Sequence, residues 1–198
     1  MVDRIHSGAC ERNRQPILEV LLEVLPEHGR VLEVASGTGM HSVYFAPRLP
    51  GIVWQPTDRD DGALRSIAAW AAAEPSENFL FLLWLDVMSR PWPCARADAI
   101  FNANMIHISP FECTEALFDG AAEVLEAGAP LVLYGPFMVD GRHTAPSNEA
   151  FDESLRGRDP AWGIRDLGVV EALAAGRGLT LERRFEMPAN NQILVFRR

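Results

Sequence analysis

A short apolar run that leads into a glycine turn, at residues 31–41, constrains the fold of this chain more than any other stretch. The run Val-Leu-Glu-Val contains Glu33, and the small residues Ala-Ser-Gly-Thr-Gly follow it, with glycines at Gly37 and Gly39. The residues after Gly39 are able to begin a helix. A parallel strand that enters a tight turn and then a helix in this way is typical of sites for nucleotide-like ligands. We therefore expect the rest of the chain to support or complete this turn.

Segments with the periods of strands and helices alternate along the whole chain. The expected strands are residues 30–35, 51–57, 78–85, 97–102, 129–134, 179–185 and 193–196. The first two expected helices run from Pro16 to Leu25 and from Met40 to Leu49. Further helices are expected around Leu64, Leu117, Leu155 and Leu167. Residues 1–14 and 139–148 have the composition of irregular segments.

Alternation at this spacing predicts parallel strands joined by right-handed helical crossovers. The predicted fold is α/β, a single domain over residues 1–198, with a Rossmann-like, doubly wound and mostly parallel sheet that has helices on both faces. Residues 1–29 are expected to form an arm and a helix that pack over the ligand side. In such sheets the functional groups gather at the carboxyl ends of the strands.

Charge and composition exclude several classes of partner. The formal net charge is -9, lysine is absent and the arginines occur as scattered pairs, so we predict no nucleic-acid partner. The longest apolar stretch, residues 79–85, is too short to span a membrane, and no signal-peptide pattern begins the sequence. The three cysteines form no CxxC pair, which is typical of reduced thiols in a cytoplasmic protein. The five dispersed histidines predict no metal site.

Polar groups follow four of the expected strands, and these groups carry the functional prediction. Glu33 ends the first strand, where it either orients the turn or accepts a hydrogen bond from an ammonium group. Asp58 lies about 20 residues after Gly37, the usual place for a carboxylate that binds ribose hydroxyls. Asp86 follows the third strand, and residues 102–107 follow the fourth. A glycine pair alone is often only a structural turn, but the successive carboxylates favour a bound ligand.

Two cofactors suit a glycine turn followed by strand-end carboxylates. A dinucleotide fold places a third glycine where this chain has Ser42, and a catalytic Tyr-x-x-x-Lys is impossible without lysine. S-adenosylmethionine requires less: a short turn for its amino-acid moiety, a carboxylate for ribose, and a polar group beside adenine, for which Asp86 is placed. The residues therefore favour S-adenosylmethionine.

At this point the chain resembles the class I S-adenosylmethionine-dependent methyltransferases. Residues 33–39 are similar to the E/D-x-G-x-G-x-G loop of that superfamily, with Ala35 in place of the first glycine. More narrowly, the chain resembles the domain-of-unknown-function family that includes methyltransferase-like protein 26. The segments that carry this resemblance are residues 11–18, 33–41, 102–110, 134–137, 162–166 and 187–191. The resemblance implies a seven-stranded sheet whose last strand runs antiparallel, and it implies little about the substrate.

The expected site residues follow from these positions. The residues expected to bind the cofactor are Asn13, Glu33, Ala35, Ser36, Gly37, Gly39, Asp58, Asp86 and Asn102. Asn13 belongs to this set if the N-terminal arm folds over the cofactor; the alternative is a solvated arm. His107, Asn104 and Tyr134 are the candidate catalytic residues, His107 as a general base and Tyr134 as part of the acceptor pocket. The alternatives are that the asparagines only cap a turn and that His107 is a structural histidine.

The leading hypothesis is an S-adenosylmethionine-dependent methyltransferase that acts on a small molecule, in which the enzyme aligns nucleophile and methyl group and excludes water. A non-catalytic protein that kept the fold and binds the cofactor or a partner is the alternative, because no compelling catalytic pair is present. A nicotinamide-dependent oxidoreductase is a third, weaker hypothesis. The acceptor and the oligomeric state are left open by the sequence.

Overall fold

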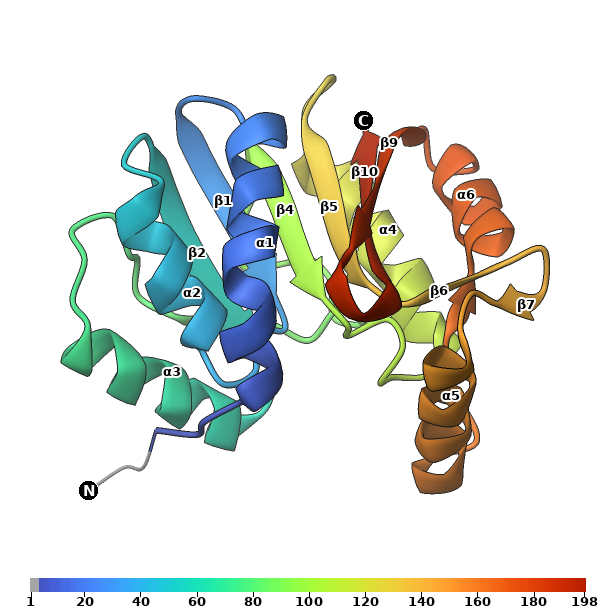
Figure 1. Cartoon of the computed structure of the whole chain (residues 1–198). Helices are drawn as coiled ribbons and strands as arrows, with labels where there is room; N and C mark the ends of the chain where they lie inside the picture. Colours follow the sequence, from blue (N-terminus) through green and yellow to red (C-terminus); the bar gives the residue numbers. More distant parts are fainter. Residues whose placement is uncertain (1–3) are drawn as a thin grey trace.

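A seven-stranded sheet forms the centre of the molecule (Figure 1). The structure, a computed structural model, describes residues 4–198. The strand order is β3-β2-β1-β4-β5-β10-β9. These strands are β1 (Gly29–Val34), β2 (Ile52–Asp58), β3 (Leu83–Trp84), β4 (Ala99–Ala103), β5 (Pro130–Gly135), β9 (Thr180–Met187) and β10 (Asn191–Arg197).

The pairing of the strands confirms the predicted topology. β1 lies parallel to both β2 and β4, and β4 lies parallel to β5. β10, the last strand of the chain, runs antiparallel to β5 and to β9. The order reverses next to β1, because β2 lies on one side of it and β4 on the other. Ligands of open α/β sheets bind at such a reversal.

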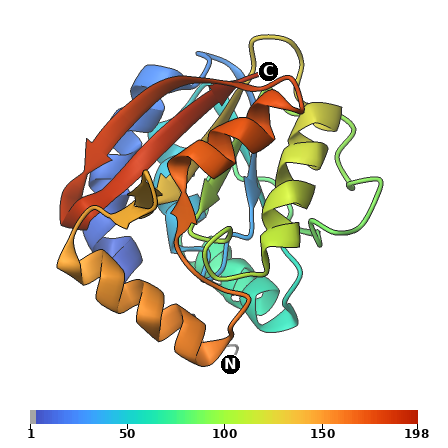
Figure 2. The ribbon, with the colours of Figure 1, turned by 90° about the vertical axis from the view of Figure 1, so that its right-hand side faces the viewer.

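Helices cover both faces of the sheet (Figures 1 and 2). The helices are α1 (Gly8–Val24), α2 (Met40–Phe45), α3 (Asp61–Ala73), α4 (Phe111–Val124), α5 (Pro146–Arg158) and α6 (Leu167–Ala175), with short 3-10 helices η1 (Ala46–Arg48) and η2 (Pro188–Asn190). α1 and α2 pack on one face, and α4 and α6 pack on the other. α5 belongs to neither layer; it lies at the carboxyl edge of the sheet.

Two hydrophobic clusters hold these layers together, one on each face of the sheet. β1 contributes to both, because successive side chains of a strand point to opposite faces. Val31 packs in the cluster under α1, while Leu32 and Val34 pack in the cluster under α4. All three side chains are buried. The near-continuous apolar run in the sequence therefore reflects a strand that is covered on both sides.

The N-terminal helix begins eight residues earlier than the sequence predicts. α1 starts at Gly8 and not at Pro16, and the Ser7 side chain caps it by accepting a hydrogen bond from the Cys10 amide at 3.3 Å. Pro16 lies inside the helix, with an uninterrupted turn before it. The Ser7 cap and the acidic Glu11 in the first turn were the signals for this earlier start. The segment around Asn13 is therefore helical, which corrects the expected irregular arm.

The expected third strand is much shorter than predicted. Only Leu83 and Trp84 pair with β2, although Phe79 forms an isolated bridge to Trp54. The side-chain amide of Asn78 donates to three backbone carbonyls before and at the start of β2, which fixes this segment without a ladder. Phe81 is 94% exposed, so the apolar run is not a buried strand.

A small second sheet lies where the sequence predicts a loop. It consists of β6 (Phe137–Val139), β7 (Arg142–His143) and β8 (Arg165–Asp166) in the order β7-β6-β8. Asp140 and Gly141 join β6 to β7, and both have positive φ. An Asp-Gly pair in this conformation makes a tight hairpin turn, so the dipeptide was a usable signal for the hairpin.

Candidate active site

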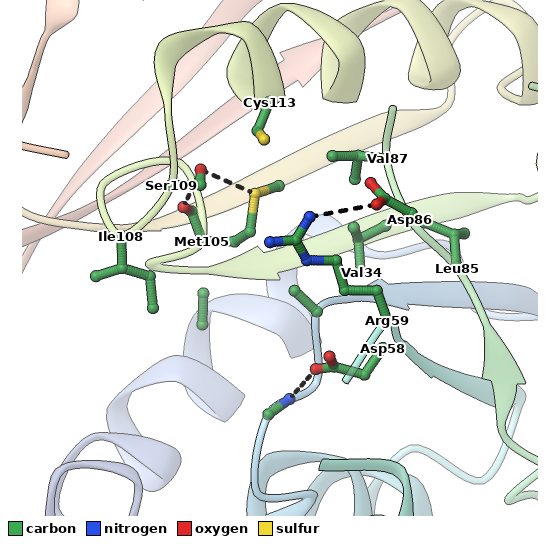
Figure 3. Close-up of a pocket in the computed structure, with 13 residues that line it drawn as sticks. Val34, Asp58, Arg59, Leu85, Asp86, Val87, Met105, Ile108, Ser109 and Cys113 are labelled. Carbon is green, nitrogen blue, oxygen red and sulfur yellow. Dashed lines mark hydrogen bonds and ion pairs between the residues drawn. The ribbon is translucent and has the colours of Figure 1, made fainter. Parts of the chain in front are cut away.

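A cleft opens at the carboxyl edge of the sheet, where β1, β2 and β4 end (Figure 3). Its volume is about 200 Å³. The lining residues are Val34, Ala35, Gly37, Asp58, Arg59, Leu85, Asp86, Val87, Ala103, Met105, Ile108, Ser109 and Cys113. The cleft thus combines a glycine turn, two carboxylates and a guanidinium group with a largely apolar wall.

The glycine turn after β1 is built from left-handed backbone. Ala35 has φ 56°, Gly37 has φ 57° and Gly39 has φ 85°. Ala35 keeps the left-handed conformation although its Cβ costs about 1–2 kcal/mol there. A Cβ added to Gly39 would lie 2.8 Å from the Ile67 Cα, so this position needs glycine for packing as well. A Cβ added to Gly37, which lines the cleft, would meet no atom within 4 Å.

Asp58 ties the end of β2 to the glycine turn. Its Oδ2 accepts a hydrogen bond from the Gly37 amide at 2.9 Å, and its Oδ1 accepts one from the Asp60 amide at 3.0 Å. The residue is only 7% exposed, yet it lines the cleft. Each carboxylate oxygen has a further lone pair, so both remain able to accept from hydroxyl groups of a ligand.

Asp86 lies on the opposite wall of the cleft and pairs with Arg59 (Figure 3). Arg59 Nη1 donates to Asp86 Oδ2 at 3.2 Å, and the Met88 amide donates to Oδ1 at 3.0 Å. The sequence predicted Asp86 but not Arg59. Arg59 could have been predicted from its position, because it directly follows the strand-end carboxylate Asp58.

Glu33 lies beneath the turn and does not line the cleft. Trp54 Nε1 donates to its Oε2 at 2.8 Å, and the Ser42 hydroxyl also donates to Oε2. Burial raises the pKa of Glu33 to about 7, although the hydrogen bonds from Ser42 and Trp54 oppose this shift. Glu33 therefore joins β1, β2 and α2 below the glycine turn, which is the orienting role among its two predicted roles.

Ser36 and Asn102 also hold the framework of the turn. The Ser36 hydroxyl accepts from the Thr57 amide at 3.2 Å, and the Ser36 amide donates to the Thr57 carbonyl at 2.8 Å. Asn102 Nδ2 donates to the Val34 carbonyl at 2.8 Å, which ties β4 to β1. Within residues 4–198, the buried Asn102 Oδ1 has no hydrogen-bond partner.

A second cavity, of about 280 Å³, lies beside the end of β5. Its lining residues are Ala9, Asn13, Asn104, Tyr134, Pro136, Ser147, Asn148, Phe151, Ala189 and Asn191. They come from α1, the ends of β4 and β5, α5, η2 and the first residue of β10. We call this space the amide cavity, because four of the ten residues are asparagines. Asn104 enters it from a left-handed residue with φ 64°.

Asn13 links the amide cavity to the start of α2. Its Oδ1 lies 2.8 Å from His41 Nε2. Because a carbonyl oxygen only accepts, the Nε2 of His41 carries the proton. Burial and the nearby Arg14 charge lower the pKa of His41 to about 4, so this ring is neutral at pH 7. Asn13 thus lies in the amide cavity and not in the cleft.

His107 is fully buried and lines neither space. The Arg165 amide donates to its Nδ1 at 3.3 Å, so the proton of the neutral ring is on Nε2. Burial lowers the pKa of His107 to about 3. Gly135 leaves room for this ring and for Asn104: a Cβ there would lie 2.5 Å from His107 Nε2 and 3.1 Å from Asn104 Oδ1.

The structure therefore divides the sequence-predicted residues into three groups. The cleft contains Ala35, Gly37, Asp58 and Asp86. The amide cavity contains Asn13, Asn104 and Tyr134. The residues that line neither space are Glu33, Ser36, Gly39, Asn102 and His107. Sequence reasoning missed Asn148 and Asn191, which α5 and the start of β10 bring to the cavity from far along the chain.

Residues 4–198 contain no group of three or more histidine, cysteine, aspartate or glutamate side chains arranged to hold a metal ion. None of the helices in this part of the chain is both long enough and apolar enough to cross a membrane.

Comparison with known proteins gives one family and many solved structures. A family model described as a protein of unknown function (DUF938) matches residues 4–198. An O-methyltransferase family protein from Burkholderia thailandensis is 17% identical, with a TM-score of 0.81 over 96% of this chain and 57% of that chain. The S-adenosylmethionine-dependent methyltransferase SibL, in its apo form, is 21% identical, with a TM-score of 0.78 over 96% and 55%.

A third structure is an O-methyltransferase family 2 protein from Planctomyces limnophilus in complex with apigenin. It is 19% identical, with a TM-score of 0.81 over 96% of this chain and 57% of that chain. The present chain thus spans little more than half the length of these three solved chains. At these identities the likeness establishes the fold, which is that of the class I S-adenosylmethionine-dependent methyltransferases.

Proposed function

The chain belongs to the DUF938 family and has a class I methyltransferase fold, and from this premise we propose that it is an S-adenosylmethionine-dependent methyltransferase with a small-molecule acceptor. The observation that carries the proposal is Asp58. This carboxylate is held by the amide of the glycine turn at 2.9 Å and lines the same cleft as Asp86. A carboxylate that ends the strand after a glycine turn is the usual hydrogen-bond acceptor for ribose hydroxyls.

The cleft fits the cofactor on the side of the glycine turn. A Cβ at Gly37 would project into open space in the cleft, so glycine leaves room for a ligand to approach the backbone. In our proposal the turn residues Ala35 and Gly37 contact the methionine part, Asp58 the ribose, and Asp86 the adenine. When bound, the cofactor supplies an electrophilic methyl group on a sulfonium sulfur.

The apolar wall of the cleft suits this chemistry. Val34, Leu85, Val87 and Met105 line the cleft beside the two carboxylates. An apolar wall excludes water, and water is the competing nucleophile for a methyl group. Because these side chains offer a ligand no N–H or O–H donor and no oxygen acceptor, the orientation of the cofactor in our proposal depends on its hydrogen bonds to Asp58 and Asp86.

We assign the acceptor side to the amide cavity. Asn104 and Tyr134 line it and are proposed to contact the acceptor. Burial raises the pKa of Tyr134, with hydrogen bonding from Asn13 in opposition, so its hydroxyl stays protonated at neutral pH. For His107 the buried neutral ring favours the structural role over that of a general base. Its contact with the Arg165 amide supports the segment that presents Asn104.

Two measurements on the intact protein test this function. Calorimetric titration with S-adenosylhomocysteine is expected to give one saturable site. Incubation of the protein with methyl-labelled S-adenosylmethionine and a small-metabolite extract is expected to transfer label to a small molecule. Binding without any transfer would favour the non-catalytic alternative, and the absence of binding would overturn the proposal. Titration with a reduced nicotinamide nucleotide is the matched negative control.

A further inference from the structure

The amide cavity adjoins the cleft through a single chain segment. Ala103 and Met105 line the cleft, while Asn104 between them lines the amide cavity. The left-handed backbone of Asn104 turns its side chain away from those of its two neighbours in sequence. A molecule in the amide cavity would therefore lie beside the same short segment, residues 103–105, that lines the cleft in which we place the cofactor.

The cavity offers no charge to a bound molecule. Within residues 4–198, its ten lining residues include no lysine, arginine, histidine, aspartate or glutamate. An ionised carboxylate or ammonium group would lose part of its hydration there without gaining an ionic partner, which is unfavourable. The lining thus selects against anions and cations alike and favours an uncharged acceptor.

The hydrogen bonds of two asparagines determine which groups they present. Asn148 Nδ2 donates to Thr144 Oγ1 at 3.0 Å and to the Asn190 carbonyl at 2.9 Å. Asn191 Nδ2 donates to the Pro188 and Ala189 carbonyls at 3.1 and 3.3 Å. Both hydrogens of each amide are therefore used, and only the carbonyl oxygens remain for a ligand. Such oxygens require N–H or O–H donors on the bound molecule.

The chemistry of the nucleophile follows from the absence of a base. Tyr134 is a protonated phenol, and the His107 ring is fully buried and does not line the cavity. A neutral hydroxyl acceptor needs a base to remove its proton, whereas a neutral nitrogen attacks through its own lone pair. The aromatic rings of Tyr134 and Phe151 supply flat surfaces for a planar molecule, and Pro136 adds a further apolar contact.

Resting on the proposed function, we propose that the amide cavity binds an uncharged, planar heteroaromatic molecule with N–H donors and that this molecule is methylated on nitrogen. The nitrogen lone pair forms the new N–C bond while the C–S bond breaks. The electron pair of that bond stays on sulfur, which leaves S-adenosylhomocysteine. The attacking nitrogen is the ring nitrogen that carries no hydrogen, so the first product is a cation. This cation then loses the N–H proton of its other ring nitrogen to water, which leaves a neutral methylated ring.

Three aromatic probes of similar overall size but different charge test the proposal. Benzimidazole is mainly neutral at pH 8, benzoate is an anion and benzylamine is a cation. Binding is measured by saturation-transfer NMR on the protein saturated with S-adenosylhomocysteine. Benzimidazole is expected to bind at least about tenfold more tightly than either ion. Equal or tighter binding of an ion, or no binding of benzimidazole, would overturn the proposal. These probe results leave the proposed function standing, because the assay begins from a protein that has already bound S-adenosylhomocysteine. Failure to bind S-adenosylhomocysteine would instead contradict the proposed function itself.

One variant sharpens the test. Asn104→Asp adds a carboxylate of the same size to the cavity, and aspartate tolerates left-handed backbone. It should reverse the preference, with benzylamine gaining about tenfold over benzimidazole. Gln15→Glu adds the same charge on the exposed side of α1 and should leave the preference unchanged. A shift in both variants, or in neither, contradicts the assignment of the cavity. Mass spectrometry of methylated benzimidazole should locate the methyl group on nitrogen, and a purely O-directed activity towards phenol would contradict the proposal.

Discussion

The cleft and the amide cavity lie on either side of Asn104, yet they are built differently. The cleft is formed by the ends of the first four strands of the chain and the residues that follow them. Its charged groups include the carboxylates Asp58 and Asp86. Five separate segments form the amide cavity, and its polar groups are neutral amides and hydroxyls. This difference agrees with our proposal, in which the fold itself provides the site for the cofactor. In the same proposal, the segments added around the fold provide the site for the acceptor.

The largest expected effect is on the glycine turn that supports the cleft. Gly39→Ala should lower the free energy of unfolding by about 3 kcal/mol, because its Cβ would clash with the Ile67 backbone at 2.8 Å and alanine is strained at φ 85°. Gly37→Ala is the matched control, since its Cβ meets no atom within 4 Å, and it should cost only about 1 kcal/mol. Chemical denaturation measures both. Equal losses would show that packing against α3 does not hold the turn.

Gly135→Ala should impair binding in the amide cavity without impairing binding in the cleft. Its Cβ would press on His107 and on Asn104, at a cost of about 2 kcal/mol in stability. Asn104 would be displaced, so binding of acceptor probes should weaken while binding of S-adenosylhomocysteine stays within about twofold. Calorimetry of both ligands measures the split. Equal weakening of both ligands would contradict the division into two spaces.

Glu33→Gln tests whether the residue beneath the turn serves structure or ligand. The pKa of Glu33 is raised to about 7, so between pH 4.5 and 7 the folded state keeps a proton that the unfolded chain has released. The contribution of Glu33 is therefore most favourable below pH 4.5 and is lost as the pH rises to about 7.

Glutamine cannot ionise, so Glu33→Gln should be more stable than the wild type at pH 8, by about 2 kcal/mol. The advantage should vanish near pH 4. His41 and His107 have lowered pKa values and act in the opposite direction, but they are common to both proteins. Denaturation at both pH values isolates Glu33. A large loss of S-adenosylhomocysteine binding in this variant would instead indicate that Glu33 contacts the cofactor.

The smallest expected effect concerns Ala35, the residue that replaces the first glycine of the loop. Ala35→Gly relieves the left-handed strain of about 1–2 kcal/mol but adds backbone freedom to the unfolded chain worth about 0.4–1 kcal/mol. The net gain in stability should be below about 1 kcal/mol. Thermal denaturation with and without S-adenosylhomocysteine checks this. A loss of stability would show that the alanine methyl group makes packing contacts that outweigh its strain.

The two sites also differ in how much of them the sequence predicts. The cleft residues Gly37, Asp58 and Asp86 were predictable, because the carboxyl ends of parallel strands must meet at one edge of the sheet. Asn148 and Asn191 were not, because their places depend on how α5 and the last turn pack, and no local pattern sets that packing. The same holds for His107: its position after β4 was predictable, but its complete burial was not.

The cleft is tested most directly through the Asp58 carboxylate. Isothermal titration with S-adenosylhomocysteine compares the wild type with Asp58→Asn and with Asp61→Asn, a neighbouring aspartate at the exposed start of α3. Loss of charge-assisted hydrogen bonds to the ribose should weaken binding to Asp58→Asn by about 10- to 100-fold. Asp61→Asn should bind like the wild type. Full binding by Asp58→Asn, with its fold intact by circular dichroism, would contradict the assignment of the cleft as the cofactor site.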